Sequence, residues 1–263
     1  PWDHFNREGA DATRWYMVTA GAPWNPMKFD PNGVRETYAK MFLTTWNVYK
    51  FHADYAALDG FDPEAQAVPV AERSALDRWV LSRLHTVAAA YHENFTNWQF
   101  HKACRDLEDF MVNDVSNWYV RRSRRRLWDD ADSHDKLACQ HTLHEVLETV
   151  CKLVAPVSPF MVDSIHRNLT GTSVHTADWP LGVPGGLEGA TADAWDEAAA
   201  KATAVLPPQD LALEQTMALV RGLAEAGRRI RIDGGRRQRL PCAQGWIVAG
   251  PDLSEFHDLL AEE

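Results

Sequence analysis

The chain has 263 residues, of which 45% are hydrophobic, and its formal net charge is −10. This length accommodates one large or two small domains with a buried core, and no apolar run approaches the ~20 residues that would span a bilayer. The first residues lack the basic and apolar stretches of an export signal, so a cytoplasmic protein is expected.

Helical periodicity dominates the chain from residue 33 onward. Apolar residues recur at spacings of three and four, which is typical of helices that bury one face. Glycine and proline mark the ends of these segments, as at Gly60 and Pro156, and Ser133 is a suitable N-cap. The helices predicted in this way cover residues 33–58, 72–95, 98–128, 133–154 and 159–169. Together they predict an antiparallel bundle between about residues 31 and 175.

The last third of the chain has a mixed pattern. Residues 180–190 are rich in proline and glycine and indicate a loop, and the alanine-rich residues 191–204 predict a weakly amphipathic helix. A longer helix is predicted at 211–231, followed by a turn at 233–235 and a strand-like segment at 240–248. The fold class expected is therefore mainly α, with a helical bundle followed by a small partial α/β element.

An arginine-rich segment, SNWYVRRSRRRLW, occupies residues 116–128 at the end of the third predicted helix. Guanidinium groups remain charged, bind phosphate through paired hydrogen bonds and stack on bases, so this segment predicts a surface for RNA or DNA. The alternative is a solvated helix face neutralised by acidic residues that follow it, namely Asp129, Asp130 and Asp132. A second basic run lies closer to the C-terminus, at Arg228, Arg229, Arg231, Arg236, Arg237 and Arg239.

Helical spacing divides the arginines of residues 121–126 into two groups. The face that carries Trp118 also carries three of them, Arg121, Arg122 and Arg125. Arg124 and Arg126 point elsewhere. Trp118 and Tyr119 continue the apolar stripe, so both are expected to be buried anchors that fix where the arginines project. The arginines on the Trp118 face are the predicted phosphate contacts, and each would add salt-sensitive affinity rather than sequence choice.

No catalytic or metal-binding constellation is evident in the sequence, which lacks a Gly-rich phosphate loop of the Walker type. His141 and His144 lie three residues apart on a predicted helix without a matching acidic or thiolate cluster, so both are interpreted as ordinary polar or partly buried histidines. The cysteines form no Cys-x-x-Cys pair, which favours reduced, mostly buried thiols over a zinc site or a disulfide scaffold. They are Cys104, Cys139, Cys151 and Cys242.

Six segments of the chain occur in the order seen in isoleucyl-tRNA synthetases. They are GADATRWYMV at residues 9–18, the arginine-rich segment, SVHTADWP at residues 173–180, and three others at 42–56, 76–84 and 153–169. The chain resembles the part of that enzyme family that follows the catalytic domain, closely over residues 1–180 and more loosely over 209–241. The valyl, leucyl and methionyl enzymes share the helical architecture but resemble these segments less.

The resemblance implies that the bundle binds the anticodon stem and loop of the tRNA for isoleucine. It divides the chain into the end of the catalytic or stem-contact segment (1–30), the anticodon-binding bundle (31–180), a linker or insertion (181–208) and the start of a C-terminal α/β junction domain (209–263). The family's two ATP-binding signatures, of the His-x-Gly-His and Lys-Met-Ser-Lys-Ser types, are absent. ATP and magnesium therefore belong to the catalytic domain of the parent ligase, and this chain alone is expected to hold no cofactor and to be inactive.

Individual residues receive roles from the same resemblance. Asp11 and Arg14 match the family's GAD…R element, which packs and forms ion pairs that position a signature loop; a local salt bridge one turn apart is compatible with this role. Trp46, Asn47 and Lys50 match a block near the anticodon loop. Asn47 is suited to a base edge and Lys50 to a phosphate, whereas Trp46 is more typical of a core residue than of a stacking platform.

The expected partner is tRNA, bound by a monomer that contacts neither DNA nor a membrane. Three alternatives stay open on the sequence alone. The chain could come from another synthetase of the same class, such as the valyl type, or form a protein-interaction scaffold whose arginines pair with acidic groups. It could also carry unrecognised chemistry in a cleft between the bundle and the C-terminal element. Binding of tRNA separates the synthetases from the scaffold.

Overall fold

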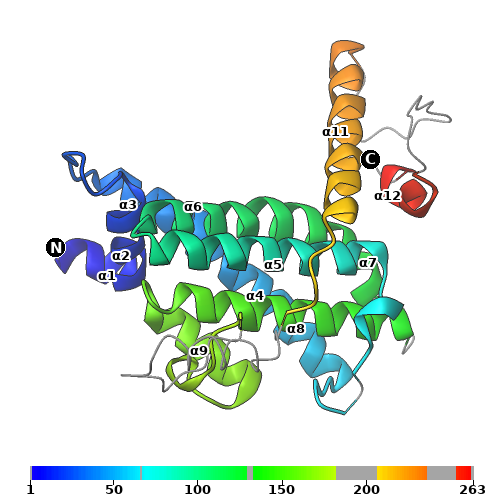
Figure 1. The fold of residues 1–263 in the computed structure, drawn as a ribbon, viewed down its shortest axis with the longest axis horizontal. Helices are drawn as coiled ribbons and strands as arrows, with labels where there is room; N and C mark the ends of the chain where they lie inside the picture. The colour runs from blue at the N-terminus through cyan, green and yellow to red at the C-terminus, as the bar shows by residue number, and fades with distance from the viewer. Residues whose placement is uncertain (1, 66, 129–132, 182–205, 236–252, 262–263) are drawn as a thin grey trace, which may run out of the picture. The chain divides into compact units, whose positions relative to one another are not determined.

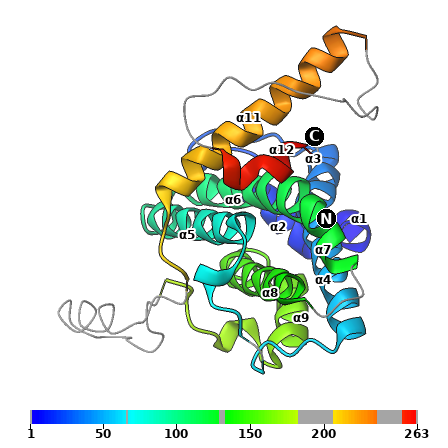
Figure 2. The same cartoon turned by 90° about the vertical axis from the view of Figure 1, so that its right-hand side faces the viewer.

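The computed structural model describes residues 2–65, 67–128, 133–181, 206–235 and 253–261 (Figures 1 and 2). Within these residues the chain forms helices and no strand, which confirms the prediction of a mainly α fold. The chain divides after Gln209 into two compact units. The strand expected at 240–248 and the alanine-rich helix expected at 191–204 lie outside the described residues. None of the helices in the described ranges is both long and apolar enough to cross a bilayer.

Two helices that the periodicity did not predict open the first unit, α1 (Trp2–Arg7) and α2 (Gly9–Thr19). The second is anchored by Trp15, which is fully buried and whose indole Nε1 donates a hydrogen bond to Glu108 Oε2 over 3.0 Å. The ring of Tyr16 packs closely against Gly33. A Cβ atom at position 33 would collide with this ring. Glycine therefore allows the following helix to approach α2.

The helix predicted at residues 33–58 is present as three consecutive segments: α3 (Pro31–Thr37), the π-helix η1 (Tyr38–Leu43) and α4 (Thr44–Asp59). Asp30 caps its start, because the carboxylate accepts a hydrogen bond from the backbone N–H of Asn32 over 2.9 Å. Gly60 ends it in a left-handed conformation with φ of 62°, which glycine adopts without steric cost.

The next two predicted helices form an antiparallel pair joined by a short turn. α5 (Ala75–Thr96) follows a short 3₁₀ turn, η2 (Val70–Glu72), and begins at Ser74, whose hydroxyl accepts from the N–H of Asp77. The chain then returns through α6 (Phe100–Asp109), the π-helix η3 (Phe110–Val120) and α7 (Arg121–Trp128). The helix predicted at 98–128 is thus continuous but contains a long π-helical part, whose i→i+5 hydrogen bonds change the rotation per residue.

The fourth and fifth predicted helices complete the bundle. α8 (His134–Val154) begins at Ser133, whose hydroxyl accepts from Lys136 N over 3.0 Å, as the sequence predicts. Most of its residues are buried, because it contacts α4, α5, α7 and α9 (Pro159–Thr170). Gly171 ends α9 with φ of 75°, and a short 3₁₀ turn, η4 (Val174–Thr176), follows. Figure 1 shows α7 at the opposite end of this bundle from α1 and α2.

The second unit contains α11 (Leu211–Asp233), η5 (Ser254–Phe256) and α12 (His257–Ala261). Asp210 caps α11, because its carboxylate accepts from Leu213 N over 2.9 Å. The helix expected at 211–231 and the turn after it are present. Of the second basic run, Arg228, Arg229 and Arg231 lie in this helix, whereas its other members lie outside the described residues.

Candidate nucleic-acid interface

The exposed face of α7 carries three arginines and a tryptophan. Arg121, Arg124, Arg125 and Trp128 are all exposed, at the spacing i, i+3, i+4 and i+7 that forms one face of a helix. Trp128 retains 58% of its accessible surface. The prediction that Arg124 points away from the predicted arginine face is therefore wrong, and Trp128 was not predicted to belong to it. The spacing of both residues from Arg121 was the signal that could have found them. We call these four residues the arginine face.

Arg122 does not belong to this face, which corrects the prediction that it is an exposed phosphate contact. Only 7% of its surface is accessible, and its guanidinium carbon lies 3.2 Å from the centroid of the Trp118 ring. A long apolar stem and a planar cation both pack well on an indole ring, so the side chain folds inward. Trp118 and Tyr119 are themselves buried, as the apolar stripe predicts.

Arg126 also points inward, toward the first turns of two other helices. Its Nη1 and Nη2 donate to the two carboxylate oxygens of Asp77 over 2.9 and 2.7 Å, and its Nε donates to Asp135 Oδ2 over 2.7 Å. Asp77 is fully buried and also accepts from the hydroxyls of Ser74 and Tyr119. Burial acts to lower the pKa of Arg126, but the hydrogen bonds to Asp77 and the electrostatic interactions with Tyr119, Asp77 and Cys139 together outweigh it and raise that pKa.

The second predicted set lies on α4, where Trp46, Asn47 and Lys50 are all exposed. The preference for Trp46 as a core residue is therefore wrong: it is 42% accessible and its ring lies 5.4 Å from that of Tyr49. Lys50 forms an ion pair with Asp54 one turn later. α4 follows the π-helix η1, and a π turn shifts the buried face, so a constant helical period places the residues of α4 poorly.

The two sets are not in one place. Asp59, at the end of α4, accepts hydrogen bonds from Lys136 Nζ and Gln140 Nε2 over 2.7 and 2.6 Å, so α4 meets α8 near the start of the latter. Arg126 bonds to the same first turn of α8 through Asp135. Asn47 lies twelve residues, or about 18 Å, further back along α4. The α4 set therefore lies apart from the arginine face, several helical turns along α4 from the point where α4 meets α8.

Asp11 and Arg14 do not form the local salt bridge that the spacing allowed. Instead, both reach the connection between α8 and α9. The Asp11 carboxylate accepts from the N–H groups of Phe160 and Met161 over 3.2 and 2.7 Å, and Arg14 Nε donates to the carbonyl of Val157 over 2.6 Å. Asp11 thus caps the N-terminus of α9, where a negative charge is favourable.

Three buried histidines, His52, His141 and His144, form a cluster in contact with the ring of Phe61. The rings of His52 and His144 are 5.8 Å apart, and His141 lies 4.9 Å from Phe61. Burial, followed by the nearby His144 and His141, lowers the pKa of His52 to about 3, and burial lowers that of His144 as well. Within the described ranges no group of histidine, cysteine and acidic side chains is arranged to hold a metal ion. His141 and His144, interpreted from the sequence as ordinary polar or partly buried histidines, are both buried.

We expect this cluster to make the first unit less stable in mild acid. His52 binds no proton in the folded state above pH ~3, whereas in the unfolded chain it binds one as the pH falls through 6.5, so the folded state loses stability in that window. Between pH 7 and pH 5 the loss is about 2 kcal/mol from this residue. Urea unfolding at both pH values measures it. The variant His52→Leu should reduce the difference, whereas His175→Gln, at an exposed site, should leave it unchanged.

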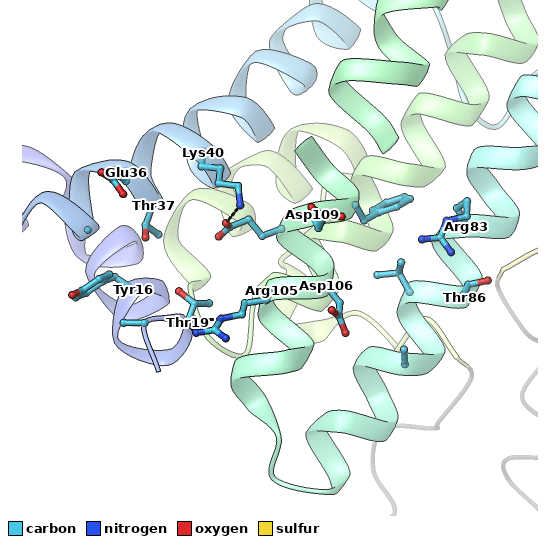
Figure 3. A pocket seen from close by; sticks show the side chains of 16 residues that line it. Tyr16, Thr19, Glu36, Thr37, Lys40, Arg83, Thr86, Arg105, Asp106 and Asp109 are labelled. Carbon is cyan, nitrogen blue, oxygen red and sulfur yellow. Dashed lines mark hydrogen bonds and ion pairs between the residues drawn. The ribbon is translucent and has the colours of Figure 1, made fainter. Parts of the chain in front are cut away.

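A cavity of about 730 Å³ is lined by residues of α2, α3, η1, α5, α6 and η3 (Figure 3). Lys40 Nζ lies 2.8 Å from Glu108 Oε1, and Arg105 Nε donates to the Thr19 carbonyl over 2.8 Å. Burial and the nearby Asp109 carboxylate raise the pKa of Asp106. These contacts join α2, η1 and α6, so the wall of the cavity holds this end of the bundle together. None of the predicted site residues lines it.

The sequence pattern of the family described as the anticodon-binding domain of tRNA ligases matches residues 77–244. The match begins at Asp77 and includes the whole arginine face, whereas Trp46, Asn47 and Lys50 precede it.

Curated relatives of the chain carry the name isoleucine–tRNA ligase. One from Porphyromonas gingivalis is 44% identical over 182 residues, which is 68% of this chain and 16% of that protein. One from Clostridium novyi is 35% identical over 271 residues, which is 100% of this chain and 24% of that protein. The chain thus spans a quarter or less of the length of these relatives. Because the family pattern covers more than half of the chain, this chain belongs to the family of anticodon-binding domains of tRNA ligases.

Proposed function

We propose that the chain binds the anticodon stem and loop of the tRNA for isoleucine, as part of a cytoplasmic ligase that joins isoleucine to this tRNA using ATP. The observation that carries the proposal is the arginine face of α7, which lies inside the family match and points away from the bundle core. The names of the relatives support isoleucine over the other amino acids.

The arginine face has the chemistry that a folded RNA requires. Arg121, Arg124 and Arg125 can each bind a phosphate oxygen of the backbone, and such contacts give affinity that falls as salt is added. Trp128 offers an exposed aromatic plane, on which an unpaired base of the anticodon loop can stack. The overall charge of −10 repels nucleic acid elsewhere on the chain, so the face also orients the RNA.

A titration of the chain with three tRNAs tests the proposal. Transcripts of the tRNAs for isoleucine, methionine and valine are compared at equal salt concentration. Tightest binding of the isoleucine tRNA supports the function as stated, and tightest binding of the valine tRNA would favour the valyl alternative. Failure of all three to bind would leave the scaffold interpretation, in which the arginines contact acidic groups of another protein.

Sequence choice is assigned to Asn47 on α4, with Lys50 beside it as a phosphate contact. Replacing Asn47 with alanine should narrow the difference in affinity between the cognate and non-cognate tRNAs, because a base-edge contact contributes about 1–3 kcal/mol of discrimination in comparable cases. The same titration measures this difference. Lys50→Ala is the matched variant on the same face, and it should weaken all tRNAs alike. If Asn47→Ala, like Lys50→Ala, weakened the binding of cognate and non-cognate tRNAs by equal factors, the assignment would be contradicted.

The chain alone is expected to catalyse neither aminoacylation nor exchange of pyrophosphate with ATP. Its sequence lacks both ATP-binding signatures of the synthetases that it resembles. The exchange assay with purified chain, isoleucine and labelled pyrophosphate measures this directly, with an intact isoleucine–tRNA ligase as positive control. Exchange above background, in a preparation free of host synthetase, would be incompatible with the expectation.

A further inference from the structure

Arg126 connects α7 to the first turns of both α5 and α8. Its Nη1 and Nη2 donate hydrogen bonds to the carboxylate of Asp77 near the start of α5. Its Nε and Nη2 donate to the carboxylate of Asp135 near the start of α8, over 2.7 and 2.8 Å. Nη2 also donates to the Asp135 carbonyl over 3.0 Å. We call these three residues the α7 clamp.

The clamp is anchored on its buried side. Asp77 is held by the Ser74 hydroxyl, which also caps α5, and by the hydroxyl of Tyr119, a fully buried residue of η3. The planar guanidinium of Arg126 has donors in fixed directions, so two carboxylates in fixed positions define the orientation of its plane. The side chain of a residue held in this way defines the rotation of the short helix that carries it.

The rotation of α7 decides which arginines face the solvent. Successive residues of an α-helix are separated by about 100°. A turn of α7 by that amount, which would carry Arg126 and Arg122 outward, would move Arg121 and Arg124 inward to the buried positions of Val120 and Ser123. The clamp and the stacking of Arg122 on Trp118 both oppose such a turn.

We infer that Arg126, Asp77 and Asp135 are positioning residues for RNA binding, which hold α7 at the rotation that presents Arg121, Arg124 and Arg125 together. This inference rests on the proposed function. The five arginines of residues 121–126 then have different roles. Arg126 contacts carboxylates of the chain itself, whereas the arginines of the exposed face contact the RNA.

Replacing Asp135 provides a test, because a positioning role and a purely electrostatic role predict opposite changes in affinity for RNA. Its side chain is 55% exposed, so its removal takes a negative charge away from the vicinity of the arginine face. If Asp135 acted only through charge, Asp135→Ala would strengthen the binding of a polyanion. As a positioning residue it should do the reverse. Arg126 keeps Asp77 as a partner in this variant, so the fold is retained.

The experiment measures the affinity of the 263-residue chain for a transcript of the isoleucine tRNA. Asp135→Ala should bind about three- to tenfold more weakly than the parent chain, the size expected when one or two hydrogen bonds that order the site are lost. Arg126→Lys, which keeps the charge but loses the planar fork, should weaken binding in the same direction. Glu72→Ala is the matched control, because it removes an exposed acid near the start of α5 that pairs with His134 rather than Arg126.

A second background separates this inference from the proposed function. In a chain that already carries Arg121→Ala and Arg125→Ala, Asp135→Ala should have little further effect, because there are few contacts left to position. Equal losses in both backgrounds, or tighter binding by Asp135→Ala in the parent chain, would overturn the inference while leaving the arginine face intact. Unchanged affinity of the Arg121→Ala, Arg125→Ala chain would overturn the arginine face itself, and the inference with it.

Discussion

Replacing Arg121 and Arg125 together with alanine is expected to weaken the binding of cognate and non-cognate tRNA alike by about ten- to a hundredfold. Each charge-assisted contact with a phosphate contributes on the order of 1 kcal/mol or more, and none of them reads a base. The log–log dependence of affinity on salt should become shallower by about one unit per lost contact, and hence by about two. Titrations at four or five salt concentrations measure both quantities.

The matched control for this variant is Arg35→Ala with Arg167→Ala. It makes the same change in net charge at exposed arginines of α3 and α9, away from α7 (Figure 1). Its affinity and salt slope should stay close to those of the parent chain. An Arg121→Ala, Arg125→Ala chain with full affinity and an unchanged slope would identify α7 as a structural or protein-facing helix. Arg122 is not part of this test, because its replacement would remove packing on Trp118.

Arg126→Met should cost the first unit about 3–5 kcal/mol of stability, the usual result of leaving one partner of a buried ion pair without the other. Among the described residues, Asp77 would remain fully buried with the side-chain hydroxyls of Ser74 and Tyr119 as its remaining donors. Urea unfolding followed by circular dichroism measures the loss.

A double variant checks the cause of that loss. Adding Asp77→Asn to Arg126→Met removes the buried charge, so the double variant should be more stable than the sum of the two single losses predicts. Strict additivity would show that the two residues stabilise the chain independently. The pair would then no longer explain the orientation of α7.

Much of the fold could be predicted because its boundaries depend on local chemistry. Ser133, Gly60 and Gly171 act through their own side chain or backbone freedom, and each ends or begins a helix where the sequence places it. The helix α2 was not predicted because its buried residues pack against distant parts of the chain. Trp15 is fixed by Glu108, ninety-three residues away, and no local pattern contains that contact.

The candidate site shows where residue spacing stops being informative. Spacing placed Arg121 and Arg125 on one face, and they are exposed together. It also placed Arg122 there, because periodicity cannot distinguish a guanidinium in water from one stacked on an indole ring. The role of Arg126 depends on Asp77 and Asp135, which belong to two other helices, so only the tertiary structure reveals it.

The π-helical segments have a consequence for how this domain can change in length. In a uniform α-helix an added or deleted residue turns everything beyond it by about 100°, which would redirect every side chain of α7. A π turn takes one more residue into the same turn of helix. The eleven residues of η3 therefore provide a place where single insertions and deletions can be absorbed during evolution, with α6 and α7 both kept in their orientations.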